Sequence, residues 1–395
     1  MFRIAWCVLL LAACRFPGTV RPTVKIGLVA PFEGRYRYVG YDVIYATRLA
    51  LREANGAGGV GGYNVELVAY DDGADPDQAT QQARKLAVDP DVVAAIGHFR
   101  EGATAAAASI YAQAGIPLVA PAVLASDLGQ GEAAVYRLGP PAEALAEALL
   151  EGVKAGSRPV RLALVTDGGP LGAALAAAAS QRQTPLLAAA SSSDPAWLVV
   201  VSASGANVVV CDADPVRAGE VVAALRGAGW EGTFLGGPEL AAADFAAVAG
   251  EAATGALFVT PWPLPADVAG SAEFIAAYRA LSPDVPPPGP LALPAYEATW
   301  VLLEALEQDI AAHGTPTREG VAAALATVGR TGLLGQIEFD GGRNWGSAPL
   351  FWYRIGADSV ARLSGLAEQL RSSHVANVTY AFRDPRSPGY SAMRR

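Results

Sequence analysis

Near the start of the chain, apolar residues follow first the pattern of a buried strand and then that of an amphipathic helix. Residues 24–30 are apolar almost without interruption and end at Pro31, as expected of a buried strand. In 40–54 the apolar residues Val43, Ala46 and Leu49 recur at helical spacing, and glycines at 56–59 mark the end of that helix. A strand followed by an amphipathic helix is therefore the first predicted unit.

The same unit repeats as far as residue 121. The pattern predicts strands at 65–70, 92–97 and 117–121 and helices at 76–86 and 102–114. Asp75 and Pro76 suit the N-cap and the first position of the helix at 76–86. The order β-α-β-α-β-α-β predicts a parallel sheet with helices on both faces, an α/β fold.

After residue 141 the alternation starts again. It predicts strands at 161–166, 207–211, 233–236, 255–260, 337–339 and 349–355, and helices at 142–155, 172–180, 215–228, 272–279, 295–308 and 318–328. Residues 357–395 lose the pattern and are expected to form a loosely attached C-terminal tail. A chain of 395 residues with two such units predicts two lobes.

Composition and charge exclude several functions. The chain is 52% hydrophobic and 17% charged, which is typical of a globular protein. A net charge of −9 without a basic block argues against a nucleic-acid partner. The three histidines show no metal-ligand spacing, and no nucleophile elbow or phosphate-binding loop occurs. We therefore expect no metal site, no cofactor and no enzymatic activity.

The N-terminus carries an export signal. Arg3 precedes an apolar run that ends in the residues LAAC at 11–14, and the run is too short to span a bilayer. The motif looks like a bacterial lipobox. We therefore expect a lipoprotein signal peptide at 1–13, a lipid anchor on Cys14 and a tether at 14–22. The alternative is an ordinary signal peptide or an uncleaved anchor with Cys14 incidental. Only Cys211 remains beyond it, as a buried residue or a reactive thiol.

Seven strings occur in a characteristic order along the chain: KIGLVAP at 25–31, IYATRLALREANGAGGVGG at 44–62, LVAYDDGADPDQA at 67–79, AIGH at 95–98, IPLVAPA at 116–122, FLGGPE at 234–239 and AATGALFVT at 252–260. This ordered set resembles the type I periplasmic binding proteins, specifically the leucine/isoleucine/valine-binding branch. The resemblance implies two Rossmann-like lobes joined by three interlobe crossovers, near 138–140, near 260–261 and between 339 and 347. Lobe 1 would then comprise 23–140 plus 261–340, and lobe 2 would comprise 141–260 plus 341–356.

The resemblance also implies where a ligand's carboxylate would bind. It places backbone N–H donors at Glu101, Ala122 and Leu124, but this chain lacks the family's hydroxyls, since Glu101 replaces a Ser and Leu124 a Thr. Three interpretations of Glu101 follow. Its carboxylate stabilises the helix and points aside, fills the anion subsite so that the ligand lacks a carboxylate, or receives a cationic group of the ligand.

Three more residues complete the predicted site. Ala74 and Arg100 occupy positions where family members carry a disulfide, and Arg100 is then free either to bind an anionic ligand or to stay solvated or paired with Glu101. Glu239 matches the residue that faces a ligand's ammonium group, unless it is a solvated loop carboxylate. Tyr296 matches an aromatic residue of the ligand pocket, unless it belongs to the core.

These implications predict an extracytoplasmic, membrane-anchored substrate-binding lipoprotein of an ABC importer, for branched-chain amino acids or a related small solute. Its partners would be a small-molecule ligand and an ABC permease, and the protein itself would be a monomer. A ligand-binding sensor not coupled to transport is the alternative. The departures at Glu101 and Leu124 give the hypothesis that unmodified leucine, isoleucine and valine bind weakly or not at all.

Overall fold

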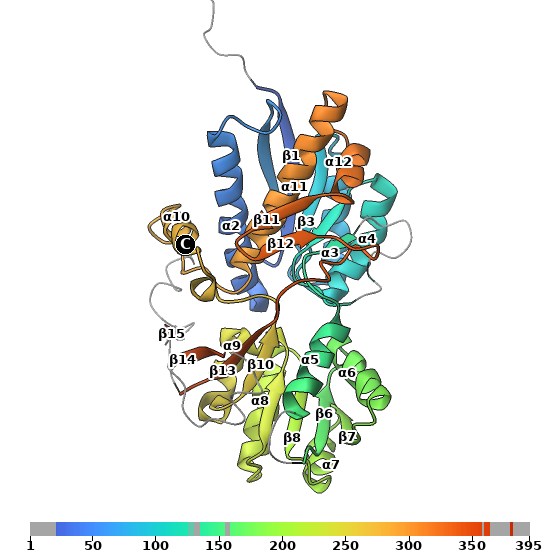
Figure 1. The fold of residues 1–395 in the computed structure, drawn as a ribbon, viewed down its shortest axis with the longest axis vertical. Helices are drawn as coiled ribbons and strands as arrows, with labels where there is room; N and C mark the ends of the chain where they lie inside the picture. The colour runs from blue at the N-terminus through green and yellow to red at the C-terminus, as the bar shows by residue number, and fades with distance from the viewer. Residues whose placement is uncertain are drawn as a thin grey trace, which may run out of the picture.

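A computed structural model describes residues 21–125, 128, 135–154, 159–357, 359–363 and 380–381. The molecule has two lobes, each with its own sheet covered by helices (Figure 1). The predicted α/β class with two lobes and parallel-rich sheets is confirmed. The predicted signal peptide at 1–13, Cys14 and most of the tether at 14–22 lie outside the described residues.

The first lobe contains a parallel sheet of five strands in the order β2-β1-β3-β4-β5. Apolar residues on one face of the sheet pack against α2 and α11, and those on the other face pack against α3 and α4. The bounds are β1 Thr23–Ala30, β2 Asn64–Asp71, β3 Val92–Gly97, β4 Leu118–Ala120, β5 Val135–Arg137, α2 Arg37–Gly56, α3 Pro76–Val88, α4 Glu101–Ala114, α10 Ala272–Arg279, α11 Ala292–His313 and α12 Arg318–Leu325.

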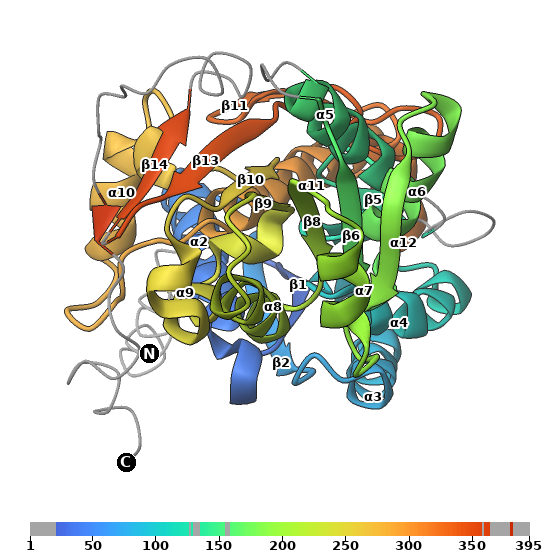
Figure 2. The same ribbon diagram turned by 90° about the horizontal axis from the view of Figure 1, so that it is seen from below.

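The second lobe contains the larger sheet, in the order β15-β14-β13-β10-β9-β8-β6-β7. Strands β6 to β10 are parallel, while β13 and β14 pair antiparallel at the edge. Figure 2 shows α5 and α6 on one face of this sheet and α8 and α9 on the other. The bounds are β6 Leu162–Thr166, β7 Leu186–Ser191, β8 Val208–Asp212, β9 Thr233–Gly236, β10 Leu257–Thr260, β13 Phe351–Ile355, β14 Ser359–Leu363, β15 Tyr380–Ala381, α5 Ala142–Lys154, α6 Pro170–Gln181, α7 Trp197–Ala203, α8 Pro215–Gly227 and α9 Ala243–Ala249.

One part of the predicted C-terminal tail requires correction. Strand β14 lies inside the range 357–395 that was expected to be loosely attached, and it pairs with β13 from Trp352↔Leu363 to Ile355↔Val360. Val360 and Leu363 are buried. The edge of the sheet has free hydrogen-bonding groups that an added strand satisfies, so this segment belongs to the second lobe.

The chain passes between the lobes three times, between β5 and α5, between β10 and α10, and between β12 and β13 (Figure 1). The short hairpin of β11 Gly329–Gly332 and β12 Gly335–Glu338 precedes the third passage. Among the described residues, none of the helices has both the length and the apolar character needed to cross a bilayer.

Two local features shape the loops that follow β2 and β3. Asp75 caps α3 by accepting a hydrogen bond from the backbone N of Gln78 at 2.8 Å, as predicted. Gly97 ends β3 with φ at +127°, and a Cβ there would lie 2.1 Å from the carbonyl oxygen of Val29. Only glycine fits so close to the neighbouring strand, and the chain turns there toward α4.

Candidate functional site

A cavity of about 400 Å³ lies between the two lobes. Its walls are formed at the carboxyl ends of the parallel strands, where open α/β sheets bind ligands. The first lobe contributes Tyr36, Ala74, Phe99, Arg100, Glu101, Gly102, Ala103, Ala122 and Leu124, and the rest is formed by 167–171, 211–214, 237–239 and Trp262. Five of the six predicted ligand-binding residues are therefore brought together: Arg100, Glu101, Ala122, Leu124 and Glu239.

Glu101 occupies the backbone donors of the neighbouring loop. It is the first residue of α4, and its Oε1 accepts a hydrogen bond from the backbone N of Leu124 at 2.5 Å. Oε2 accepts a weaker one from the N of Ala125 at 3.4 Å. Burial raises the pKa of this carboxyl group, and the two hydrogen bonds oppose the shift. The interpretation in which Glu101 points aside is wrong, because its carboxylate binds these N–H groups itself.

Arg100 and Glu239 pair with each other across the cleft. Nη1 of Arg100 lies 2.6 Å from Oε1 of Glu239, which joins the first lobe to the second. The guanidinium also stacks on the ring of Tyr36, 4.7 Å from its centroid. The sequence predicted that Arg100 would bind a ligand, be solvated or pair with Glu101. Its partner is instead Glu239, so neither charge is left unpaired.

The second lobe presents three aspartates to the cavity. Oδ2 of Asp212, at the end of β8, accepts a hydrogen bond from the N of Gly172 in the first turn of α6 at 2.6 Å. Burial raises the pKa of Asp212 to about 6. Asp214 caps α8 and pairs with Arg35 of the first lobe, and its own N donates to Asp167 Oδ2 at 3.1 Å. Carboxylates of the protein thus accept backbone hydrogen bonds at both helix starts.

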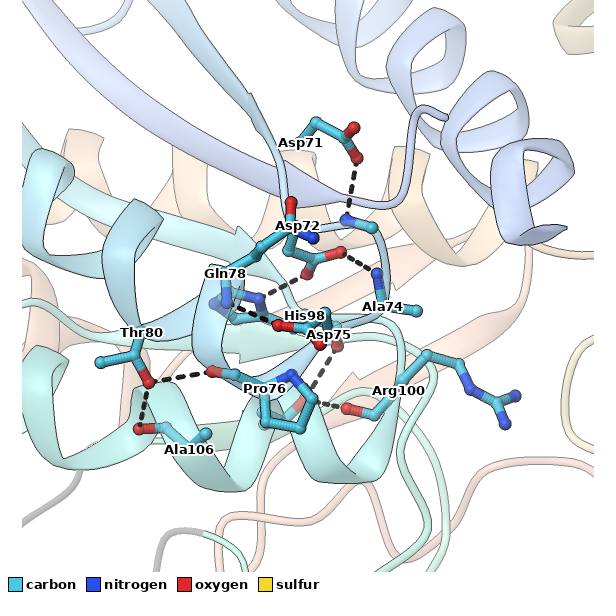
Figure 3. A network of polar contacts seen from close by, with 12 residues as sticks. Asp71, Asp72, Ala74, Asp75, Pro76, Gln78, Thr80, His98, Arg100 and Ala106 are labelled. Carbon is cyan, nitrogen blue, oxygen red and sulfur yellow. Dashed lines mark hydrogen bonds and ion pairs between the residues drawn. The ribbon is translucent and has the colours of Figure 1, made fainter. Parts of the chain in front are cut away.

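A buried polar network supports the loop that carries Arg100 and Glu101 (Figure 3). His98 Nδ1 lies 2.6 Å from Asp72 Oδ2, and both side chains are almost completely buried. Asp72 Oδ1 accepts from the N of Ala74 at 2.9 Å, and Thr104 donates to the carbonyl oxygens of His98 and Arg100. The two segments that a disulfide joins in the resembled family are joined here by hydrogen bonds.

Tyr296 requires correction. It does not line the cavity but lies on α11, where its hydroxyl donates to Glu53 Oε2 on α2 at 2.6 Å. Its ring packs against Phe274 at 5.0 Å between centroids. Tyr296 therefore stabilises helix packing in the first lobe, because α11 turns this position away from the cleft.

Trp262 and Cys211 line the cavity as well. Trp262 follows β10 on the second passage between the lobes and is 8% exposed, and its Nε1 has no hydrogen-bond acceptor within the described parts of the chain. Cys211 is a free, buried cysteine, and burial raises the pKa of its thiol well above the usual value. The reactive-thiol interpretation is therefore unsupported, and Cys211 acts as a small apolar residue.

Metal chemistry is not indicated in the part of the chain that the structure describes. Within it, no group of three or more His, Cys, Asp and Glu residues is arranged to hold a metal ion.

Comparison with known proteins identifies the fold and the family. A family model described as "Periplasmic binding protein" matches residues 23–359. The chain belongs to the periplasmic binding protein family. It is 26% identical over 351 residues to a Leu/Ile/Val-binding protein homolog of Brucella abortus, covering 84% of this chain and 90% of the relative. A leucine-, isoleucine-, valine-, threonine- and alanine-binding protein of Pseudomonas aeruginosa is 25% identical over 334 residues, covering 80% of this chain and 86% of that one.

Solved structures of transporter binding proteins have the same fold. The branched-chain amino acid transporter substrate-binding protein LivJ of Streptococcus pneumoniae, in complex with isoleucine, matches with a TM-score of 0.74 and 23% identity, over 86% of this chain and 99% of that one. A solute-binding protein of an ABC transporter from R. palustris, in complex with benzoate, matches with a TM-score of 0.71 and 20% identity. The match covers 87% of this chain and 96% of that one. The predicted family is confirmed, and family and fold are those of transporter binding proteins.

The sequence did not single out His98, Asp72, Asp167, Asp212 or Trp262 as parts of the site. The three aspartates and His98 lie within two residues after predicted strands, which is a signal that could have found them, because strand ends face the cleft in this class of fold. Trp262 carries a similar signal, since it lies two residues after the predicted strand at 255–260.

Proposed function

We propose that this chain is the extracytoplasmic substrate-binding lipoprotein of an ABC importer, anchored through Cys14, which delivers a small solute to a membrane permease. The cavity of about 400 Å³ between the lobes carries the proposal, because its walls come from both lobes and close on one another through the Arg100–Glu239 pair. The size lies at the lower end for small-molecule sites, which favours a small ligand.

The ligand would differ from the free branched-chain amino acids. Glu101 already occupies the Leu124 and Ala125 donors, and Arg100 already neutralises Glu239. An α-carboxylate that binds these donors and an α-ammonium group that pairs with Glu239 would each have to displace a side chain of the protein. The R. palustris relative, whose structure holds benzoate, supports the view that this fold does not restrict the ligand to amino acids.

A thermal-shift screen with amino acids, amides, amines and short acids tests the binding role. A compound that binds only the folded state raises the melting temperature. We expect at least one compound to do so, and the shift should disappear in the cavity-filling variant Ala122→Trp but persist in Glu251→Gln, an exposed site outside the cavity. A shift that survives Ala122→Trp would place binding elsewhere and contradict the proposal.

Transport separates the two functional alternatives. Loss of uptake of that compound when the gene is deleted, together with neighbouring permease and ATPase genes, supports an importer component. Unchanged uptake would favour a sensor lipoprotein that reports the same ligand to another partner.

A further inference from the structure

Acidic groups outnumber basic groups around the cavity. Among the described residues that line it, the charged side chains are one guanidinium, Arg100, and five carboxyl groups: Glu101, Asp167, Asp212, Asp214 and Glu239. Arg100 pairs with Glu239, and Arg35 pairs with Asp214. The other three carboxyl groups form no ion pair within the described parts of the chain.

Carboxyl groups of the protein already accept hydrogen bonds from several backbone N–H groups that could attract an anion. Glu101 accepts from Leu124, Asp212 from Gly172 in the first turn of α6, and Asp214 from the first turn of α8. An incoming carboxylate or phosphate would compete with these carboxylates for the N–H groups and would be repelled by them. The cavity therefore disfavours anionic ligands.

The remaining walls suit a cation with an apolar body. Asp167 and Asp212 stand on one side of the cavity, and the rings of Phe99 and Trp262 also line it. Tyr36, another lining ring, already holds two guanidinium groups, Arg100 at 4.7 Å and Arg35 at 5.3 Å from its centroid. Aromatic faces attract cations, and the indole of Trp262 is the strongest of these acceptors.

We propose that the ligand is an organic cation, an amine without an α-carboxylate, whose ammonium group lies against Asp167 and Asp212. This inference rests on the proposed binding function and names the chemical class of its ligand. Glu101 and Arg100 then serve to exclude α-amino acids. Glu101 occupies the Leu124 and Ala125 donors that an α-carboxylate would use, and Arg100 neutralises Glu239, the acceptor that an α-ammonium group would use.

A matched pair of compounds tests the ligand class. Isoamylamine and 4-methylpentanoate share leucine's apolar branch but keep only its amine or only its carboxylate. In calorimetric titrations of the full-length protein, we expect isoamylamine, or the diamine putrescine, to bind at least about tenfold more tightly than 4-methylpentanoate. Equal or tighter binding of the acid, or binding of neither amine, would overturn the inference.

Single-charge variants locate the ammonium group. Asp167 is exposed, so Asp167→Asn should fold normally, and we expect it to weaken amine binding several-fold, as Asp212→Asn should. Glu251→Gln, also in the second lobe but outside the cavity, should leave affinity unchanged. Amine affinity that is the same in all three variants would contradict the assignment.

The two proposals fail in different ways. Preference for the acid would remove the cationic class and leave the cavity as the binding site. The binding function itself fails when no compound in the broad screen produces a melting shift that Ala122→Trp abolishes.

Discussion

Two arginine–glutamate pairs in this molecule have the same chemistry and different surroundings. Arg100 and Glu239 are 2.6 Å apart, link the two lobes, and are 27% and 34% exposed at their side chains. Arg330 on β11 and Glu297 on α11 are 2.9 Å apart within the first lobe, and their side chains are 17% and 0% exposed.

Both arginines lie against an aromatic ring, but the buried pair also has a further ion-pair partner and a backbone hydrogen bond that are not found for the cleft pair among the described residues. Glu297 also accepts from the N of Leu333 at 2.6 Å, and Arg330 also pairs with Glu304 and lies 5.2 Å from the ring centroid of Trp300. A solvent-exposed ion pair contributes little to the free energy of unfolding and breaks easily, whereas loss of one partner of a buried pair lowers that free energy strongly. The difference teaches that Glu297 holds a lobe together and that Arg100–Glu239 suits a contact that opens and closes.

Breaking the buried pair should have the largest effect. Glu297→Ala leaves Arg330 with one carboxylate fewer and leaves the N–H of Leu333 without its acceptor. We expect the free energy of unfolding to fall by about 3–5 kcal/mol, measured by urea denaturation. Glu251→Gln is the control and should change it by less than about 0.5 kcal/mol. If Glu297→Ala lowered the free energy of unfolding by less than about 1 kcal/mol, the buried pair would contribute no more to stability than the cleft pair, and the contrast between the two would be wrong.

The network behind Arg100 should have an intermediate effect. His98→Ala deprives the buried carboxylate of Asp72 of its closest side-chain partner, and we expect a loss of roughly 1–3 kcal/mol in the same assay. His313 provides a comparison, because its ring also pairs with an aspartate, Asp309, at 2.7 Å but is 62% exposed. If His313→Ala lowers the free energy of unfolding as much as His98→Ala does, burial does not determine how much these two histidine–aspartate pairs contribute to stability.

Removing the interlobe pair should cost little stability. For Glu239→Gln we expect the free energy of unfolding to decrease by at most about 1 kcal/mol, because the side chains of Arg100 and Glu239 are both partly solvated. Loss of the charge should nevertheless shift the ligand-free protein toward open lobes and raise its radius of gyration in small-angle scattering. A loss of several kcal/mol with unchanged scattering would mean that the pair is structural, like Arg330–Glu297.

The smallest predicted effect is a pH dependence of amine binding. Asp212 has its pKa raised to about 6 by burial, so it is ionised at pH 7.5 and largely protonated at pH 5. A bound cation favours the ionised form, and the affinity should therefore fall several-fold as the pH drops through about 6. Asp212→Asn should flatten the curve between these values in calorimetry. An affinity that rises on acidification would contradict the assignment of Asp212.

Much of the fold was predictable from local pattern. The β1 and β3 runs and the Asp75 cap depend on neighbours in sequence and were found. The strands β5 and β7 were missed. The first has three residues, and the second, at 186–191, is partly exposed and half alanine, so neither has a distinctive period. Strand β14 was missed because its pairing with β13 depends on tertiary contact.

The site was predictable only as a location. The alignment of motifs placed Arg100, Glu101 and Glu239 near one cavity, but not their partners. Arg100 and Glu239 are 139 positions apart and belong to different lobes, so their contact follows from how the lobes meet. The direction in which the Glu101 carboxylate points depends on the path of the loop after β4, which a single sequence does not define.

Calorimetric titration of leucine into the full-length protein tests the central claim most directly. The account predicts no heat of binding up to millimolar leucine, because the Leu124 donor is occupied by Glu101 and Glu239 is neutralised by Arg100. Micromolar binding of leucine would contradict it, since both side chains would then have to give way to an ordinary amino acid.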